Sequence, residues 1–412
     1  MDFRKPVFPE ETAAAQEETG QAAVIAAARG LLVVVSLLTV FGLTMLYSAS
    51  YGTAGLKYFR NQLIWVAFGA AGGVAGFLAG YRRIASKAML WLGISFVLLL
   101  TAAFCFPAIN GANRWIRFRI PGMELSLQPS EFAKIAVALF VAKYCSENFR
   151  TFNNLRGRNG MLPLAACAGT VILGILLGRD LGTTILVTCA ALGIMVAAGL
   201  YLRYLVVPAA FGGLIGVYIY FHDPARVARV VSFSQPELMQ QGKGYQLWNS
   251  LLALGSGGWR GIGFMESRLK ARYLPEAHTD FILAIVGEEL GMLAMVGVIL
   301  LYTAFTWFAL RIAIRSNSRL GMLLGFGLTL GISLQALINI GVVTGSIPTK
   351  GMPAPFISYG GSNMMASLIA VGLLLSIAAE TACPGYSEQY WNTIRSHLAF
   401  LPWWRKYRNR EE

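Results

Sequence analysis

Charged residues are scarce in this sequence. Asp, Glu, Lys and Arg make up only 13% of the 412 residues, whereas an ordinary soluble domain carries roughly 25%. Hydrophobic residues account for 56%. This balance excludes a typical soluble domain for most of the chain and indicates that lipid is its main solvent.

Several motifs of well-known enzyme classes are also missing. The sequence has no P-loop, no glycine pattern of a dinucleotide-binding fold, and no HExxH or GxSxG in a suitable context. ATP-driven, redox and zinc chemistry therefore lack support. The basic residues are spread over loops on both sides of the expected membrane, so we expect no nucleic-acid partner.

The five cysteines are isolated and show no metal-ligand spacing. Most lie inside or at the ends of apolar runs, where cysteine usually acts as a small packing residue. We therefore infer neither a disulfide nor a metal site from them. They are Cys105, Cys145, Cys167, Cys189 and Cys383.

Long apolar runs are abundant, and each is long enough to cross a hydrocarbon core of about 30 Å. Because lipid cannot satisfy an open backbone, such runs form helices, and the alternating pattern of a barrel is absent. We predict an all-α polytopic membrane protein with about ten transmembrane helices. The expected spans are 31–50, 61–80, 86–106, 129–146, 161–178, 182–200, 205–221, 281–310, 320–345 and 363–379.

The first run lies too far behind the N-terminus to be a cleaved signal peptide. Lys and Arg residues of the short loops fall on the side of the termini, which places both termini in the cytoplasm. Residues 1–30 and the basic residues 382–412 are then cytoplasmic tails around a transmembrane domain over 31–381. Three outer stretches remain: 107–128, the large loop 222–280 between spans seven and eight, and 346–362.

Two outer stretches carry bases against this charge rule. A solvated loop can simply contain some Arg and Lys. Alternatively, the bases hold an anionic ligand such as a phosphate, since Arg binds phosphate oxygens through two parallel hydrogen bonds. Both interpretations stay open. The bases are Arg114, Arg117, Arg119, Arg226, Arg229, Lys243, Arg260, Arg268, Lys270 and Arg272.

Asp280 lies at the outer membrane surface, directly before an apolar span. It is either the N-cap of that helix or a general base placed where an amphipathic substrate presents its head group. His278 lies two residues earlier and does not share a helical face with Asp280. A satisfied loop histidine is the simpler interpretation of His278.

Residues 128–134 combine helix-start chemistry with two ionisable side chains. Pro129 or Ser130 can begin the helix, and Glu131 and Lys134 can pair at i, i+3. A structural ion pair and a substrate contact are both open, because ionisable residues in spans are functional candidates. Asp180, Glu288 and Glu289 occupy comparable positions, and two or three of these residues can line one polar cavity.

The stretch 346–362 is too rich in Pro and Gly for a continuous helix, yet too apolar for a freely solvated loop. A re-entrant segment packed against protein fits both facts. It is either a plain connector or one wall of a substrate groove.

The motifs at these positions resemble the SEDS family (shape, elongation, division and sporulation) of polytopic glycosyltransferases, which includes FtsW and RodA. The resemblance covers roughly residues 31–381. One departure is Gly178-Arg179, where the family usually has an acidic residue or Gln followed by Pro. The matching motifs are NGANRWI at 110–116, QPSEFAK at 128–134, DLGT at 180–183, LPEAHTDF at 274–281, GEELG at 287–291 and PAPFISYGGS at 353–362.

The resemblance implies an enzyme that polymerises lipid II, an undecaprenyl-diphosphate-linked disaccharide peptide, into peptidoglycan strands. It places the family's essential outer-loop aspartate on Asp280. By the same match, Arg114, Trp115, Glu131 and Lys134 correspond to functionally sensitive positions of the family. The predicted substrate-binding set is Arg114, Trp115, Glu131, Lys134, Asp180, His278, Lys350 and Ser358.

The implied reaction converts an α-linked diphosphate donor into a β-1,4 glycan. Such inversion needs one displacement and one base, by analogy with inverting glycosidases. Asp280 is expected to deprotonate the acceptor 4-hydroxyl. The leaving diphosphate requires positive charge, from Arg114 and Lys134 foremost or from a divalent cation, Mg or Mn, that bridges the diphosphate.

The resemblance is stronger to the division branch, FtsW, than to the elongation branch, RodA. It implies a place in the bacterial cytoplasmic (inner) membrane at the division site, with the active site on the outer face. The expected partners are a class B penicillin-binding protein (an FtsI-like transpeptidase), other divisome membrane proteins and membrane lipid.

Two rival functions share the same fold. A flippase for the same precursor also carries charged residues within spans and a broken segment. Against a flippase, the candidate polar residues cluster on the outer side, and the two halves show no matching pair of interrupted helices. A non-catalytic scaffold for division proteins would not need Asp280.

Overall fold

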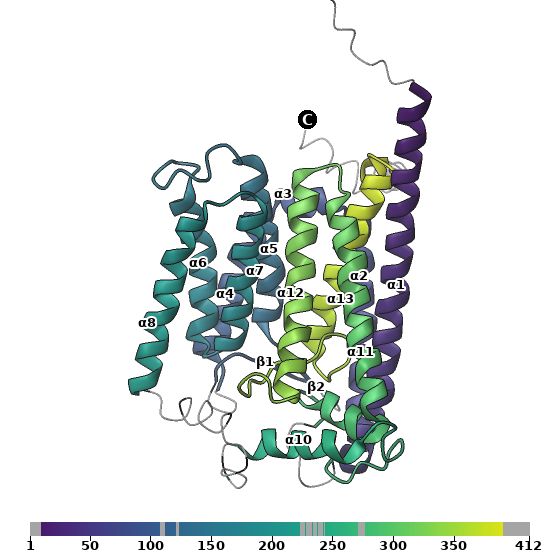
Figure 1. Ribbon diagram of the computed structural model, residues 1–412. Helices are drawn as coiled ribbons and strands as arrows, with labels where there is room; N and C mark the ends of the chain where they lie inside the picture. The colour runs from purple at the N-terminus through teal and green to yellow at the C-terminus, as the bar shows by residue number, and fades with distance from the viewer. Residues whose placement is uncertain are drawn as a thin grey trace, which may run out of the picture.

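The computed structural model describes residues 10–107, 112–120, 123–222, 244–270 and 277–389, with four single residues between them. Long helices run side by side through most of this chain (Figure 1). The predicted all-α polytopic class is confirmed.

Each of the ten predicted spans falls on a helix. Seven stretches of the described chain are long and apolar enough to cross a membrane, judged by length and composition. Helices α6 and α7 are apolar but have only 17 residues each, so the count of ten crossings stays a prediction. The helices are α1 (Glu10–Ala54), α2 (Lys57–Ala79), α4 (Ala88–Cys105), α5 (Pro129–Glu147), α6 (Met161–Leu177), α7 (Leu181–Ala197), α8 (Val206–His222), α11 (Ile282–Ile314), α12 (Arg319–Val343) and α13 (Gly361–Ala382).

The expected outer stretches contain regular structure that the apolar pattern did not predict. Strands β1 (Ile116–Ile120) and β2 (Met123–Leu127) form an antiparallel hairpin in which Ile116 lies opposite Leu127. Helix α10 (Tyr245–Gly257) lies within the long stretch 222–280. The short elements α3 (Tyr81–Ser86) and η1 (Leu202–Leu205) connect longer helices.

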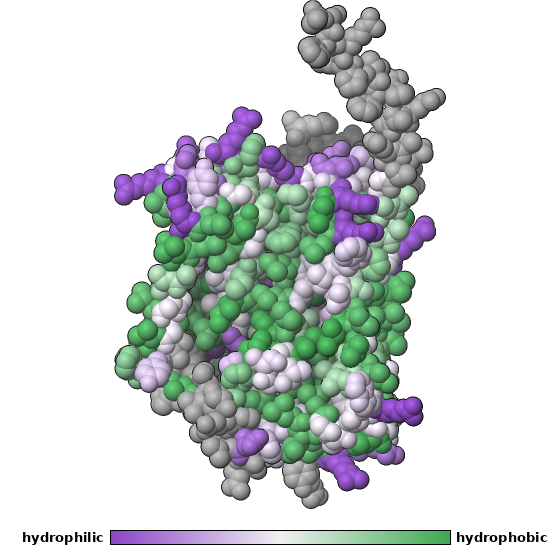
Figure 2. All heavy atoms as spheres, in the orientation of Figure 1, coloured by the Kyte–Doolittle hydropathy of each residue, from purple (hydrophilic) through white to green (hydrophobic). Residues whose placement is uncertain are grey.

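The hairpin and α10 lie at one end of the bundle, which we call the hairpin end. Helix α1 begins, and α13 ends, at the opposite end (Figure 1). On the face shown in Figure 2, apolar side chains form a band between two hydrophilic ends. This arrangement fits an even number of crossings, while the cytoplasmic side stays a prediction. The predicted N-terminal tail is helical from Glu10 onward, and residues 1–9 and 390–412 lie outside the described residues.

Helix α11 is interrupted at Gly291, which has φ 76° and ψ −174°. Only glycine adopts positive φ without a steric cost, and a Cβ here would lie 2.6 Å from the Trp259 carbonyl oxygen. The predicted span over 281–310 is therefore not one continuous helix. A buried helical part over 282–290 precedes the long part.

Helices α2 and α13 pack with their backbones in close contact. A Cβ on Gly73 would lie 2.7 Å from the Leu368 carbonyl oxygen, and a Cβ on Gly372 would collide with the Gly73 carbonyl oxygen. Small residues allow such close approach between membrane helices. This contact holds α13, and the segment before it, against α2.

Gly372→Val is expected to destabilise the protein by about 1–3 kcal/mol or more, because the added side chain meets backbone that cannot move aside. Thermal unfolding of the purified protein in detergent measures the effect. Gly297→Val on α11 is the control, since nothing lies within 4 Å of a Cβ there. An unchanged unfolding temperature in Gly372→Val would contradict the packing described.

Candidate active site

Asp280 lies in a turn directly before α11. The N-cap position of α11 is Phe281, whose side chain makes no capping hydrogen bond. Asp280 therefore lies one residue before the N-cap position at which it was expected. The backbone carbonyl of Asp280 accepts a hydrogen bond from Asn339 Nδ2 at 2.9 Å. Its carboxylate faces Gly351, where a Cβ would lie 2.7 Å from Asp280 Oδ2.

Two amide side chains on α12 hold this region together. Asn339 Nδ2 also donates to the Met352 carbonyl at 2.6 Å. One turn earlier, Gln335 Nε2 donates to the Pro353 carbonyl at 2.9 Å and to Asn363 Oδ1 at 3.0 Å. Both amides are buried. Sequence reasoning missed them, although two amides four residues apart in an apolar run were a signal.

The segment 346–360 contains turns and no regular helix. Met352, Phe356 and Ile357 are buried, so the segment packs against protein as predicted, and its re-entrant placement in the membrane stays a prediction. Ser358 is also buried, and its Oγ accepts a hydrogen bond from the Ala354 backbone N–H at 2.8 Å. This contact stabilises the turn, and substrate binding by Ser358 stays a prediction.

Lys350 connects the Asp280 region to the start of α7. A Cβ on Gly182, in the first turn of α7, would lie 2.8 Å from Lys350 Cε. Gly351, the next residue, faces the Asp280 carboxylate. Asp280, Lys350 and the N-terminus of α7 therefore belong to one site.

Asp180 is the N-cap of α7 and accepts a hydrogen bond from the Thr183 backbone N–H at 3.2 Å. The buried carboxylate also accepts from Gln128 Nε2 at 2.9 Å and Ser130 Oγ at 3.2 Å. Arg114 Nη1 lies 3.6 Å from Asp180 Oδ1. One outer base of the sequence analysis thus has an internal carboxylate partner.

The ion pair with Asp180 leaves part of the hydrogen-bonding capacity of Arg114 unused. Its side chain is 29% exposed, and its buried Nε has no hydrogen-bond partner among the described residues. Trp115 follows it, half-buried, just before β1. The turn that leads to Asp180, where the sequence departs from the family pattern, places Arg179 at φ 60°.

Glu131 and Lys134 form the predicted i, i+3 ion pair, at 2.6 Å. Helix α5 begins at Pro129, as predicted. Lys134 Nζ also donates to Gln335 Oε1 at 2.6 Å, so the pair joins the amide network of α12. A pocket between α5, α7, α12 and α13 begins at this pair and is lined mainly by apolar residues, including Leu186, Leu328, Ile332 and Ala366.

His278 packs against aromatic rings. Its ring stacks on Tyr58 with centroids 4.3 Å apart, and the Tyr359 ring contacts both. The His278 carbonyl accepts from the Tyr359 backbone N–H at 2.9 Å. These contacts support the structural interpretation, and substrate binding by His278 stays a prediction.

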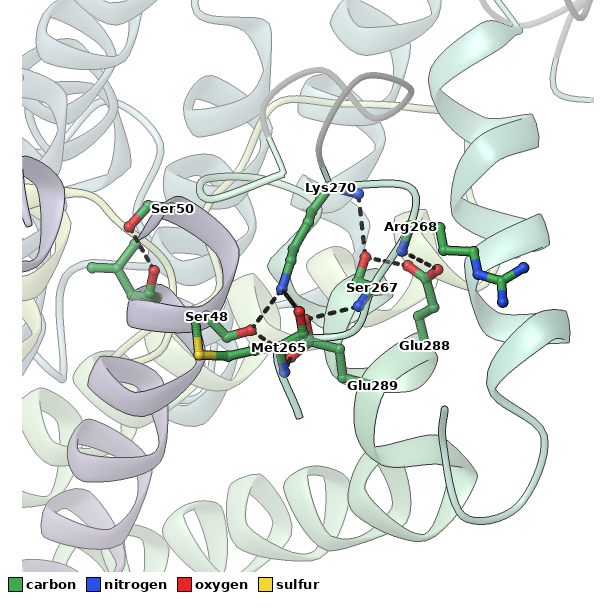
Figure 3. A network of polar contacts seen from close by, with 9 residues as sticks. Ser48, Ser50, Met265, Ser267, Arg268, Lys270, Glu288 and Glu289 are labelled. Carbon is green, nitrogen blue, oxygen red and sulfur yellow. Dashed lines mark hydrogen bonds and ion pairs between the residues drawn. The ribbon is translucent and has the colours of Figure 1, made fainter. Parts of the chain in front are cut away.

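Glu288 and Glu289, which the sequence grouped with Glu131 and Asp180, lie in a separate network with Ser48 and Lys270 (Figure 3). Lys270 is thus a second outer base with an internal partner. The other predicted features at 110–111, 226, 229, 243 and 272–276 lie outside the described residues.

A metal ion was one predicted source of positive charge. Among the residues that the structure describes, no three His, Cys, Asp or Glu side chains gather to hold a metal ion. A divalent cation that bridges diphosphate oxygens needs only one or two protein carboxylates. Asp280 would be one such carboxylate here, and the Mg or Mn ion stays a prediction.

Gly351→Ala is expected to lower catalytic activity about tenfold to a hundredfold with little loss of stability. The new methyl group displaces the Asp280 carboxylate, which can rotate away, and small misplacements of reacting groups are costly. Initial rates and thermal unfolding measure the two effects. Gly169→Ala is the control, because a Cβ there meets nothing within 4 Å. Equal rates in Gly351→Ala and Gly169→Ala would contradict the close contact between Gly351 and the Asp280 carboxylate.

The site is thus a carboxylate at the hairpin end with Lys350 beside it. A partly exposed Arg114 lies at the Asp180 cap of α7, and an apolar pocket lies close to α12. Such a site suits base catalysis on the polar head of an amphipathic, anionic substrate.

Residues 28–382 match the FtsW, RodA and SpoVE family, described as cell cycle proteins. The chain is 36% identical over 360 residues to a protein of Trichlorobacter lovleyi named "Probable peptidoglycan glycosyltransferase FtsW", covering 85% of this chain and 92% of the relative. It is 34% identical over 362 residues to stage V sporulation protein E of Bacillus subtilis, covering 84% and 96%.

Solved structures agree with these relatives. One chain comes from a structure described as "Structural coordination of polymerization and crosslinking by a peptidoglycan synthase complex". It matches with a TM-score of 0.70 and 25% identity, covering 85% of this chain and 97% of that chain. The rod shape determining protein RodA of Thermus thermophilus matches with a TM-score of 0.62 and 25% identity, covering 85% and 96%.

Proposed function

Since this chain belongs to the FtsW, RodA and SpoVE family of cell cycle proteins, we propose that it is a peptidoglycan glycosyltransferase of the FtsW type. It polymerises lipid II into glycan strands during cell division. The observation that carries the mechanism is the placement of Asp280, whose backbone is held by Asn339 and whose carboxylate faces Gly351 next to Lys350.

Asp280 acts as the general base. It takes the proton from the 4-hydroxyl of the acceptor sugar as that oxygen attacks the anomeric carbon of the donor. The bond from this carbon to the diphosphate breaks in the same displacement, so configuration is inverted with a single carboxylate. The Asn339 contact fixes the backbone that carries the base, which limits the freedom lost on reaching the transition state.

Positive side chains stabilise the leaving diphosphate. Arg114 has unused hydrogen-bonding capacity and partial exposure, and Lys350 lies between Asp280 and α7. Lys134, which the resemblance also suggested, is already engaged by Glu131 and Gln335. We therefore assign the diphosphate to Arg114 first, and Lys350 is the second base at this site.

The protein is a multi-pass membrane protein. We place it in the bacterial cytoplasmic membrane at the division site, with the hairpin end and Asp280 on the outer face. Its proposed partner is a class B penicillin-binding protein, together with other divisome membrane proteins. A similar chain in a complex described as joining polymerisation to crosslinking supports this pairing.

Polymerisation of purified lipid II in detergent micelles tests the proposed function. Detergent micelles do not separate two aqueous compartments, so a flippase would produce no glycan strands in this assay. We expect glycan strands when the protein is mixed with its penicillin-binding protein and transpeptidation is blocked. If no strands form while lipid II crosses the bilayer of reconstituted vesicles, the transporter function replaces the polymerase.

A further inference from the structure

Two adjacent carboxylates, Glu288 and Glu289, are buried at the end of the short helical part 282–290, and each is only 1% exposed. Burial of a carboxylate is costly unless it is paired and hydrogen-bonded. The C-terminal end of a helix also carries partial negative charge, which disfavours carboxylates there. Two Glu residues at this point therefore require compensating contacts.

Glu289 has a full set of partners from two other segments (Figure 3). Its carboxylate pairs with Lys270 Nζ at 2.6 Å and accepts from the backbone N–H groups of Met265 at 3.1 Å and Ser267 at 3.4 Å. Ser48 Oγ on α1 also donates to it. Lys270 Nζ in turn donates to the Met265 carbonyl and to Ser48 Oγ. The pair thus joins α1, α11 and the segment 265–270.

Glu288 binds the same segment through hydrogen bonds, and no cation of the described residues pairs with it. Its carboxylate accepts from the Ser267 hydroxyl and from the Arg268 backbone N–H at 3.0 Å. Both of these partners are neutral groups. The ionic part of the network is therefore the contact between Glu289 and Lys270.

The backbone at the break in α11 is tied to the same region. The carbonyls of Glu288 and Glu289, which end the short helical part, accept hydrogen bonds from Ile262 and Gly263 N–H groups at 3.0 Å each. The Met292 N–H, which begins the long part, donates to the Gly258 carbonyl at 2.9 Å. Gly261 leaves no room for a side chain against Glu289. Backbone and side-chain contacts thus fix the end of the short helical part.

Asp280 lies two residues before this short helical part. Its nine residues, 282–290, span about 13 Å, and 282–286 are almost completely buried. Asp280 therefore lies at one end of a buried helical rod whose other end is held by the Glu289 network. The chain also reaches Asp280 from Lys270, ten residues earlier in the sequence. The chain on either side of Asp280 therefore leads to the same ion pair, to Lys270 before it and to Glu289 after it.

We propose that Glu289 and Lys270 are positioning residues for the reaction: their buried ion pair clamps the rod 282–290 and the segment 265–270, and so sets the position of Asp280. This inference rests on the proposed function, because it takes Asp280 as the base. Loss of the clamp moves the base and lowers kcat, whereas lipid II, bound elsewhere in the site, keeps its KM.

Glu289→Gln tests the clamp, since it keeps the shape of the side chain but removes the charge that Lys270 requires. In the full-length protein with its penicillin-binding protein, kcat for glycan synthesis is expected to fall at least tenfold with KM unchanged. Amide hydrogen exchange over 277–281 is expected to increase, while exchange in α12 and α13 stays the same. Glu266→Gln, an exposed carboxylate on the same segment, is the control with unchanged rate.

Lys270 gives a second pair of variants if Glu289→Gln folds poorly. Lys270→Met is expected to lower kcat as Glu289→Gln does, while Lys270→Arg keeps the charge and recovers most of the rate. The double variant Lys270→Met/Glu289→Gln is expected to be no slower than the slower single variant, because both changes remove the same ion pair.

Wild-type kcat in folded Glu289→Gln or Lys270→Met, with Asp280→Asn inactive, would overturn the clamp and leave the proposed function intact. An equal loss of kcat in Glu266→Gln would also overturn the clamp, because removal of any charge from the segment would then have the same effect. Full activity of Asp280→Asn would instead refute the proposed role of Asp280, whatever the clamp variants do.

Discussion

Asp280→Asn is expected to lower the rate of glycan-strand synthesis from lipid II by about 10²–10⁴-fold, the usual contribution of a positioned base. Asparagine is close to aspartate in size, yet its amide cannot take the proton of the sugar hydroxyl. The hydrogen bond from Asn339 goes to the backbone carbonyl of residue 280, so the substitution leaves it in place. Initial rates at saturating lipid II measure the loss.

Controls separate loss of the base from loss of the fold. Asp280→Asn should unfold at the wild-type temperature and bind the penicillin-binding protein normally. Glu147→Gln, which removes an exposed carboxylate from the far end of α5, should keep the full rate. If folded Asp280→Asn and Asp280→Ala both polymerise lipid II at the wild-type rate, Asp280 is not the base.

Lys134→Met has the second largest expected effect, because it leaves Glu131 buried without its cation. Glu131 is 3% exposed and lies 2.6 Å from Lys134 Nζ. Removing one partner of a buried pair typically costs about 3–5 kcal/mol. The change also removes the hydrogen bond to Gln335, which in turn holds Pro353. We expect a lower unfolding temperature and a large loss of glycan synthesis.

The same helix offers a matched control. Lys143 pairs with Glu147 at 4.0 Å, at i, i+4 on α5, and Glu147 is 62% exposed. Exposed pairs of this kind contribute about 0.3–0.5 kcal/mol, so Lys143→Met should change the unfolding temperature little. If Lys134→Met and Lys143→Met lower the unfolding temperature equally, the buried Glu131–Lys134 pair contributes no more to stability than the exposed Lys143–Glu147 pair.

Features set by local pattern were predictable from the sequence. Apolar runs located the ten helices because burial in lipid depends on run length and composition. The start of α5 at Pro129 and the pair of Glu131 with Lys134 follow from helix geometry at a spacing of three. The family resemblance through the LPEAHTDF and GEELG motifs selected the correct family.

Features set by contacts between distant segments were not predictable. Asn339 reaches Asp280 and Met352 from α12, and no spacing rule links these positions. The N-cap position of α11 falls on Phe281 and not on Asp280, because the chain turns once more before the helix begins. The break at Gly291 was hidden because both parts of α11 are apolar, so hydropathy shows one run. Glu288 and Glu289 belong to a different network from Glu131. This grouping was also not predictable, because only the fold determines which polar residues come into contact.

The most direct test of the account compares wild type and Asp280→Asn in one assay of glycan-strand formation from purified lipid II, with the penicillin-binding protein present and transpeptidation blocked. We expect long strands from wild type and none above background from folded Asp280→Asn. Strands of equal amount and length from both proteins would contradict it.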